Sequence, residues 1–111
     1  MKKKVENKGA RSRLKPLPNG DLEEFAELLK ALASTARLKL VNTLAGGEYT
    51  VTELCKLTGL KQSLVSQQLK ILRLNNIVAS RKEVPHTYYR LNNDHILEML
   101  GCLRRCRSKK S

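Results

Sequence analysis

Hydrophobic residues recur with helical spacing over the first two thirds of the chain. The first stripe falls at positions i, i+3, i+4 and i+7 and consists of Phe25, Leu28, Leu29 and Leu32. This spacing places the four side chains on one face, and it predicts a helix that begins near Asp21 or Leu22.

Capping residues mark the ends of two further helices. Ser34 is a favoured N-cap for a second helix, which Gly46 and Gly47 would end. The expected buried side of this helix carries Leu38, Val41, Leu44 and Ala45. Thr50 and Glu53 have the spacing of a capping box and predict a short third helix through about residue 57. The expected inner side of this third helix carries Val51, Leu54, Cys55 and Leu57.

A fourth helix is predicted over residues 62–74, after a turn that contains Gly59. Its apolar positions share one face and are Val65, Leu69 and Leu72. The opposite face is polar and carries Ser63, Ser66, Gln67, Lys70 and Arg73. Such a helix packs its apolar face on a core and leaves the polar face to solvent.

Two short runs, 77–83 and 87–91, predict the strands of a β-hairpin connected through Val84-Pro85-His86. Asn92 or Asn93 is expected to cap a last helix that extends to about Arg104. The apolar stripe of this helix consists of Ile96, Leu100 and Leu103. The whole pattern predicts a mainly α-helical fold with a small hairpin, in the order α-α-α-α-β-β-α.

The length and composition indicate one small domain. The chain has 111 residues, of which 41% are hydrophobic, and this suffices for one core. We divide it into a basic N-terminal arm (1–20), a folded domain (21–106) and a basic tail (107–111). No membrane segment or secretory signal is expected, because no apolar run follows the basic start. Three unevenly spaced cysteines are no disulfide framework and favour a reducing cytoplasm.

The formal net charge of +12 is unevenly distributed. Residues 1–19 and 104–111 are strongly basic, and residues 56–90 carry seven basic residues against one acidic residue. Residues 20–55 carry three basic residues against six acidic ones. A positive surface attracts polyanions, and counterion release supplies much of the affinity for nucleic acid. For the two tails alone, a role in solubility explains the charge equally well.

The third and fourth predicted helices, joined by a Gly-containing turn, form a helix-turn-helix pattern. The polar face of the fourth helix suits the major groove, since Gln can pair with adenine and Lys or Arg with guanine or phosphate. The hairpin would act as a wing that contacts the DNA backbone or minor groove through Arg81, Lys82 and Arg90. The order of elements therefore predicts a winged helix-turn-helix protein that binds double-stranded DNA.

The sequence resembles the ArsR–SmtB family of small dimeric winged-helix repressors over about residues 22–106. The matching segments are Leu28-Leu29-Lys30-Ala31-Leu32-Ala33, Ala36-Arg37-Leu38, Thr52-Glu53-Leu54, residues 63–73, Ile77-Val78 and Tyr88-Tyr89-Arg90-Leu91. The resemblance implies a homodimer joined through the first and last helices. It also implies an inverted-repeat operator, with one recognition helix in each half-site. A bacterial or archaeal protein of the cytoplasm, associated with the nucleoid, is expected.

The resemblance also assigns roles to residues around the fourth helix. The base-edge readers would be Gln62, Ser63, Ser66 and Gln67. The phosphate contacts would be Lys61, Lys70 and Arg73. The family often has serine where Lys61 stands and histidine where Gln68 stands, and both differences bear on operator preference. Its wing tip usually carries glycine, whereas Pro85 predicts a stiffer tip.

The inducer motifs of the family are incomplete in this chain. The thiolate metal site would need cysteines at Thr50 and Thr52, and the sulfur sensors would need one near Asn42. The zinc site of the last helix would fall on Asn93, His95, Cys106 and Lys109. Only the histidine of that set is retained, so the usual zinc site is not expected.

One band of candidate ligands remains on the last predicted helix. At about 100° per residue, His95, Cys102 and Cys106 fall within about 40° of one another. Across a dimer they could bind zinc or another soft or borderline metal ion, or the thiols could cross-link the subunits. The alternative is that small cysteines simply pack at a helix interface, with no cofactor and an unknown inducer.

Other functional classes explain the sequence less completely. An inducer-independent architectural protein would coat DNA through the basic tails and would keep no footprint on one palindrome at physiological salt. A protein-interaction module would not require the polar face of residues 62–74. An enzyme is not expected, because we find no nucleophile–base pair, no paired carboxylates in an apolar setting and no glycine-rich phosphate loop.

Overall fold

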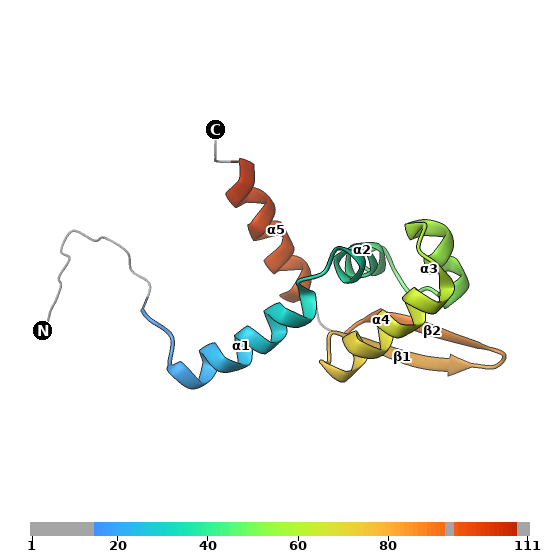
Figure 1. Ribbon diagram of the computed structural model, residues 1–111, viewed down its shortest axis with the longest axis horizontal. Coiled ribbons are helices and arrows are strands. Elements are labelled where there is room, and N and C mark those ends of the chain that lie inside the picture. Colours follow the sequence, from blue (N-terminus) through green and yellow to red (C-terminus); the bar gives the residue numbers. More distant parts are fainter. Residues whose placement is uncertain (1–14, 93–94, 109–111) are drawn as a thin grey trace, which may run out of the picture.

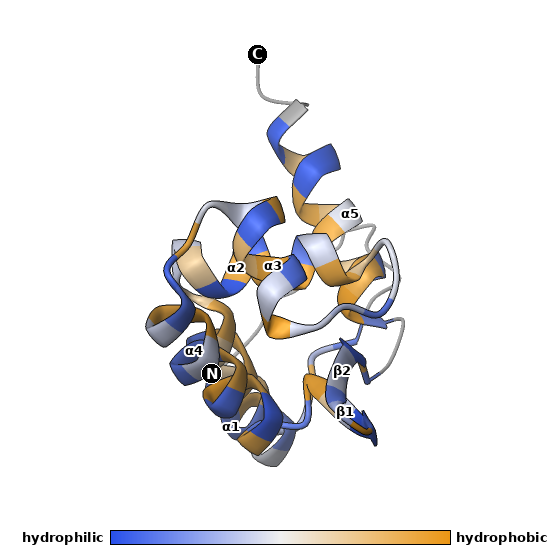
Figure 2. Ribbon diagram, turned by 90° about the vertical axis from the view of Figure 1, so that its right-hand side faces the viewer, coloured by the Kyte–Doolittle hydropathy of each residue, from blue (hydrophilic) through white to orange (hydrophobic). Residues whose placement is uncertain are grey.

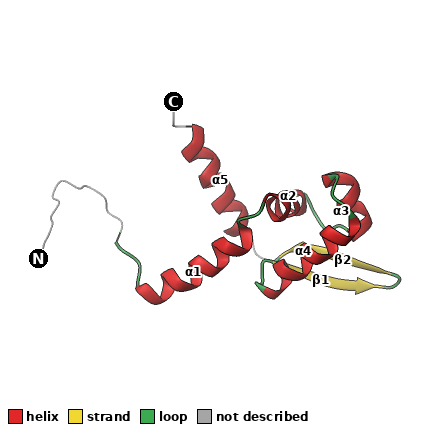
Figure 3. Cartoon of the chain, in the orientation of Figure 1, coloured by secondary structure: helices red, strands yellow, loops and turns green. Residues whose placement is uncertain are grey.

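The computed structural model describes residues 15–92 and 95–108, which form five helices and one antiparallel hairpin (Figure 1). The elements are α1 (Asn19–Leu32), α2 (Thr35–Leu44), α3 (Val51–Thr58), α4 (Gln62–Leu74), β1 (Val78–Glu83), β2 (His86–Leu91) and α5 (His95–Ser108). This is the predicted order of elements. Figure 3 shows the hairpin beside α4, with α1 and α5 on the opposite side of α2 from α3.

The core lies where α2, α3 and α4 pack on one another and on the base of the hairpin. The largest fully buried side chains are Leu40, Val41, Leu54, Val65, Leu69, Leu72 and Ile77. No polar side chain is buried within the described ranges. In Figure 2, which is coloured by hydropathy, α1 and α4 each carry both hydrophobic and hydrophilic residues. The aliphatic core therefore holds α4 by one face only.

Local capping interactions agree with the sequence. The Ser34 hydroxyl accepts a hydrogen bond from the Arg37 backbone N–H and begins α2. The α2 helix ends at Leu44, and Gly47 follows with a φ of 148°. Gly59 ends α3 in the left-handed conformation with a φ of 78°, which glycine adopts without a Cβ clash.

Several side chains that we expected in the core are exposed. Leu38, Leu57 and Ala45 are all exposed, whereas Leu40, absent from the prediction, is fully buried. The reason is the rotation of α2, which turns Leu40 and Leu44, one helical turn apart, into the core. Leu38 instead lines a groove towards α5.

The apolar stripes of the first and last helices are also only partly covered. Phe25 and Leu29 on α1 are 40% and 52% exposed, and Leu103 on α5 is 55% exposed. In contrast, Leu32 and Ile96 are buried where these helices meet the core. The two helices thus present uncovered hydrophobic surface, as elements of an interface would.

Element boundaries differ from the predictions by a few residues. The first helix begins at Asn19 rather than near Asp21, and α5 extends to Ser108 rather than to Arg104. The Asn92 side chain donates to the Asn76 carbonyl oxygen at 3.0 Å, so it ties the strand end to the α4–β1 turn. Asn93, the other predicted cap, lies outside the described residues. Within the part of the chain described here, no helix is long and apolar enough to cross a bilayer.

Candidate nucleic-acid interface

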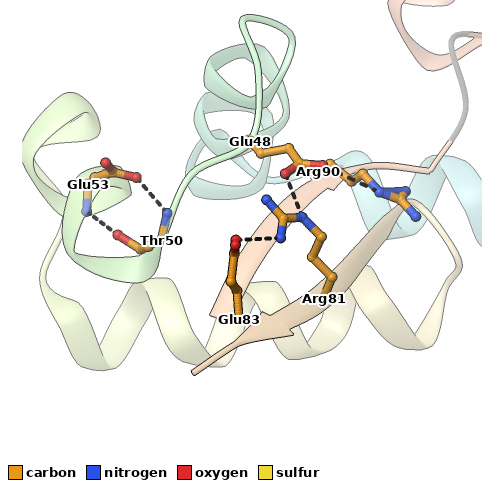
Figure 4. Close-up of polar contacts among 6 residues, drawn as sticks. All are labelled: Glu48, Thr50, Glu53, Arg81, Glu83 and Arg90. Atoms are coloured by element: carbon orange, nitrogen blue, oxygen red, sulfur yellow. Dashed lines mark hydrogen bonds and ion pairs between the residues drawn. The ribbon is translucent and has the colours of Figure 1, made fainter. Parts of the chain in front are cut away.

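The helix-turn-helix begins with a complete capping box on α3. The Thr50 backbone N–H donates to Glu53 Oε1 at 2.8 Å, and the Glu53 N–H donates to Thr50 Oγ1 at 3.2 Å (Figure 4). At the other end, the Thr58 hydroxyl donates to the Leu54 carbonyl and accepts from the Leu60 N–H. These contacts fix the short helix and the turn that leads into α4.

The α4 helix separates its two faces as its sequence predicts. Val65, Leu69 and Leu72 are at most 1% exposed and anchor the helix to the core. The predicted DNA-contact residues around this helix are all exposed to solvent, namely Lys61, Gln62, Ser63, Ser66, Gln67, Lys70 and Arg73. The helix carries no acidic residue. The arrangement presents amides, hydroxyls and positive charge on one continuous face.

Gln68, between the two faces, takes part in a contact that sequence reasoning missed. Its Oε1 accepts from Arg37 Nη1 at 2.7 Å. The same guanidinium donates through Nε to the Ala31 carbonyl at 2.5 Å and through Nη2 to the Lys30 carbonyl at 3.4 Å. Arg37 therefore joins the C-terminal end of α1 to the side of α4. No local pattern indicates this link, because Arg37 and Gln68 are 31 residues apart.

The wing is an antiparallel hairpin in which Val78 pairs with Leu91 and Glu83 with His86. Arg81, Lys82 and Arg90, its predicted contact residues, are all exposed. Backbone hydrogen bonds between Tyr49 and Tyr89, at 3.1 and 2.8 Å, attach the hairpin to the loop before α3. This bridge fixes the wing relative to the helix-turn-helix.

Carboxylates surround the first arginine of the wing. Arg81 Nε lies 2.8 Å from Glu48 Oε1, and Arg81 Nη1 lies 2.7 Å from Glu83 Oε1. These hydrogen bonds, to Glu83 and then to Glu48, raise the pKa of the Arg81 guanidinium. The guanidinium also lies 4.7 Å from the centre of the Tyr88 ring. Glu48 is absent from the sequence-based site, because it precedes β1 by 30 residues.

The predicted sensor residues lie on α5 but do not form one site within the chain. Cys102 and Cys106 are exposed, and Cys102 Sγ accepts from Arg105 Nη2 at 3.2 Å. His95 Nδ1 lies 3.0 Å from Glu98 Oε1. His95 and Cys102 are seven positions apart, which is a rise of about 10 Å along the helix axis and does not suit two ligands of one ion with bonds near 2 Å. Among residues 15–92 and 95–108, no group of three His, Cys, Asp or Glu side chains could hold a metal ion.

The exposed polar α4, the turn before it and the attached hairpin define a winged helix-turn-helix protein of the DNA-binding class. The profile of a family described as "Bacterial regulatory protein, arsR family" matches residues 34–80. A biofilm growth-associated repressor from Agrobacterium fabrum is 44% identical over 80 residues, which cover 72% of this chain and 68% of that protein.

Two solved structures extend the comparison to the fold. The transcriptional repressor BigR from Xylella fastidiosa is 36% identical with a TM-score of 0.72, over 81% of this chain and 96% of that one. A homodimeric winged helix-turn-helix DNA-binding domain from Mycobacterium bovis is 26% identical with a TM-score of 0.73, over 82% and 84% of the two chains.

The chain belongs to the ArsR family of bacterial regulatory proteins. It is a DNA-binding transcriptional regulator, as the order of its elements predicted.

Proposed function

We propose that two copies of this chain form a repressor that binds an inverted-repeat operator with one α4 helix in each half-site. The observation that carries the proposal is the two-sided α4, which is buried through Val65, Leu69 and Leu72 and leaves its amide-rich face exposed. Related proteins named as repressors, and the homodimeric neighbour, support the proposal.

Different residues of the α4 region would supply specificity and affinity. Gln62, Ser63, Ser66 and Gln67 read base edges in the major groove, where amides pair with adenine and hydroxyls with several bases. Lys61, Lys70 and Arg73 hold phosphates and set the register of the helix on the duplex. Lys82 adds a phosphate contact from the wing.

The dimer would cover the apolar surface that α1 and α5 leave exposed. A groove of about 370 Å³ lies between these helices and is lined by Phe25, Leu28, Leu29, His95, Ile96 and Met99. A second groove of about 280 Å³, which Leu38 and Leu103 help to line, adjoins it through Leu29 and Met99. No residue of α4 lines either groove, so an interface there leaves the recognition helices available.

Repression follows from steric occlusion, because a dimer seated on a palindrome within a promoter excludes RNA polymerase. The protein would act on the chromosome, in the cytoplasm. The DNA that flanks its gene provides an inexpensive check: a palindrome in that promoter supports autoregulation and supplies a first operator sequence.

Gln67→Ala provides a direct test of base reading. The substitution removes a bidentate partner for adenine, so we expect operator affinity to fall by about 5- to 100-fold, with little change on random DNA. Binding of both duplexes is measured by fluorescence anisotropy at fixed salt. Asn42→Ala, which removes an exposed amide on α2, is the matched control and should leave both affinities unchanged.

Equal losses on operator and random DNA would contradict the reader role of Gln67. If the unmodified protein shows no footprint on any palindrome at physiological salt, the architectural alternative replaces the repressor proposal. A specific regulator is expected to keep such a footprint while non-specific binding disappears.

A further inference from the structure

An acidic residue from outside the wing lies against both of its strands. Glu48 belongs to the loop between α2 and α3, and the Tyr49–Tyr89 backbone bridge holds this loop beside β2. Glu48 Oε1 lies 2.8 Å from Arg81 Nε on β1, and Glu48 Oε2 lies 3.7 Å from Arg90 Nε on β2 (Figure 4). One carboxylate therefore faces both wing arginines.

The cluster around this carboxylate is electrically neutral. Glu83 supplies the second acid, with Oε1 2.7 Å from Arg81 Nη1, so two arginines face two glutamates. The strongly basic charge that the sequence gives to residues 56–90 is therefore partly cancelled by a residue that the fold brings in from the acidic segment before it. Lys82, between Arg81 and Glu83, takes part in none of these ion pairs.

These ion pairs are exposed enough for a DNA phosphate to replace the glutamates as partners of the arginines. The side chains of Arg81 and Arg90 are each 46% exposed, and that of Glu48 is 35% exposed. Exposed pairs of this kind are weak and screened by salt. A duplex held close by the recognition helix presents several phosphates at once, and these can form ion pairs with the arginines in place of the glutamates. A loosely bound duplex cannot do so.

We propose that Glu48, together with Glu83 at Arg81, competes with phosphate inside the chain and withholds Arg81 and Arg90 from DNA until the wing lies against the DNA backbone. The inference rests on the proposed function, because it assumes that the wing approaches the DNA backbone. Its consequence is specificity. Non-cognate DNA gains nothing from the two arginines, while a cognate site displaces Glu48 from both arginines and Glu83 from Arg81, and so gains both contacts.

The salt dependence of binding to a random-sequence duplex measures the number of phosphates that the protein neutralises. In the unmodified protein Arg81 and Arg90 do not contribute. Glu48→Gln leaves Arg90 without its acid, so we expect the slope of log K against log salt to steepen by about 0.9 per bound chain. The double variant Glu48→Gln/Glu83→Gln also releases Arg81, and the expected change is about 1.8.

Glu27→Gln is the matched control for charge. It also removes one exposed carboxylate from an ion pair, with Lys30 at 3.2 Å, but on α1 and away from the wing. It should leave the slope unchanged. A Glu48→Gln slope equal to that of Glu27→Gln, or a weaker affinity than that control, would overturn the proposal, since Glu48 would then be neutral or would support binding.

Truncation of Arg81, with the same measurement of salt dependence, is the complementary experiment. Arg81→Ala should leave the slope of the unmodified protein unchanged but should remove about half of the gain in Glu48→Gln/Glu83→Gln. Lys82→Ala should reduce the slope in both backgrounds. If Arg81→Ala and Lys82→Ala reduce the slope equally in the unmodified protein, Arg81 already contacts phosphate and the proposal is wrong. An unmodified protein that binds no duplex at any salt would refute the proposed function instead.

Discussion

Side-chain and backbone caps made by residues close together in the chain hold the ends of α2 and α3. The capping box of Thr50 and Glu53, the Ser34 cap and the turn at Gly59 are all present as expected, because each involves groups within about four residues. Glu48 and Arg37 were missed for the opposite reason. Their partners Arg81 and Gln68 are 33 and 31 residues away. Counting charges along the sequence places Glu48 in the acidic segment 20–55, whereas in the fold it lies beside the basic wing.

Thr50→Ala should destabilise the domain by about 1 kcal/mol, because it removes the acceptor for the Glu53 N–H at the start of α3. The free energy of unfolding from urea titration measures the change. Thr52→Ala, two residues later and exposed, is the control and should have a smaller effect. Equal effects would mean that the cap contributes nothing to folding.

At the scale of elements, hydrophobic periodicity and capping residues together located the helices and strands of the described residues, but they did not always identify the buried face. The prediction for α4 is correct at Val65, Leu69 and Leu72, because its apolar stripe is narrow and all of it meets the core. The predicted burial of Leu38 and Leu57 is wrong, because a helix with apolar residues on two sides can pack only one of those sides against the core. For α2, that second side faces the groove beside α5.

Arg37→Ala tests the connection between α1 and α4. The substitution leaves the Ala31 carbonyl and Gln68 Oε1 without their charged donor, and we expect a loss of about 1–3 kcal/mol in unfolding free energy. Lys39→Ala removes an exposed positive charge from the same helix and should change stability by less than about 0.5 kcal/mol. Indistinguishable values for the two variants would show that the link does not stabilise the fold.

For the whole molecule, the single chain accounts for its core but not for the apolar surface of α1 and α5. Sequence periodicity places Phe25, Leu29 and Leu103 on apolar stripes, which does not say what covers them. The resemblance to the family implies that the first and last helices of a second chain do so. Their exposure of 40%, 52% and 55% is consistent with that expectation. Periodicity alone cannot separate a core from an interface, because both bury the same kinds of side chain.

Leu29→Glu should convert the proposed dimer into a monomer that still folds, since it places a charge in the groove between α1 and α5. Sedimentation equilibrium gives the mass, and circular dichroism reports the fold. Leu57→Glu introduces the same charge at an exposed leucine of α3 and should leave the mass unchanged. A dimeric Leu29→Glu protein would contradict the proposed interface.

The α5 thiols give a further prediction for the dimer. If the band of His95, Cys102 and Cys106 senses metal or oxidant, Cys102→Ser/Cys106→Ser will no longer release the operator when zinc, cadmium, arsenite or peroxide is added. Release is followed by anisotropy of labelled operator. Unchanged release in the double variant would leave these cysteines as packing residues only.

The proposed repressor places two α4 helices in successive major grooves of one duplex. Hydroxyl-radical footprinting of the unmodified protein, on a duplex selected from a random pool, tests this placement. We expect protection centred on two inverted half-sites, one helical turn of about 34 Å apart, with two chains per duplex. Uniform protection with no selected sequence, or one chain bound at a single half-site, would contradict it.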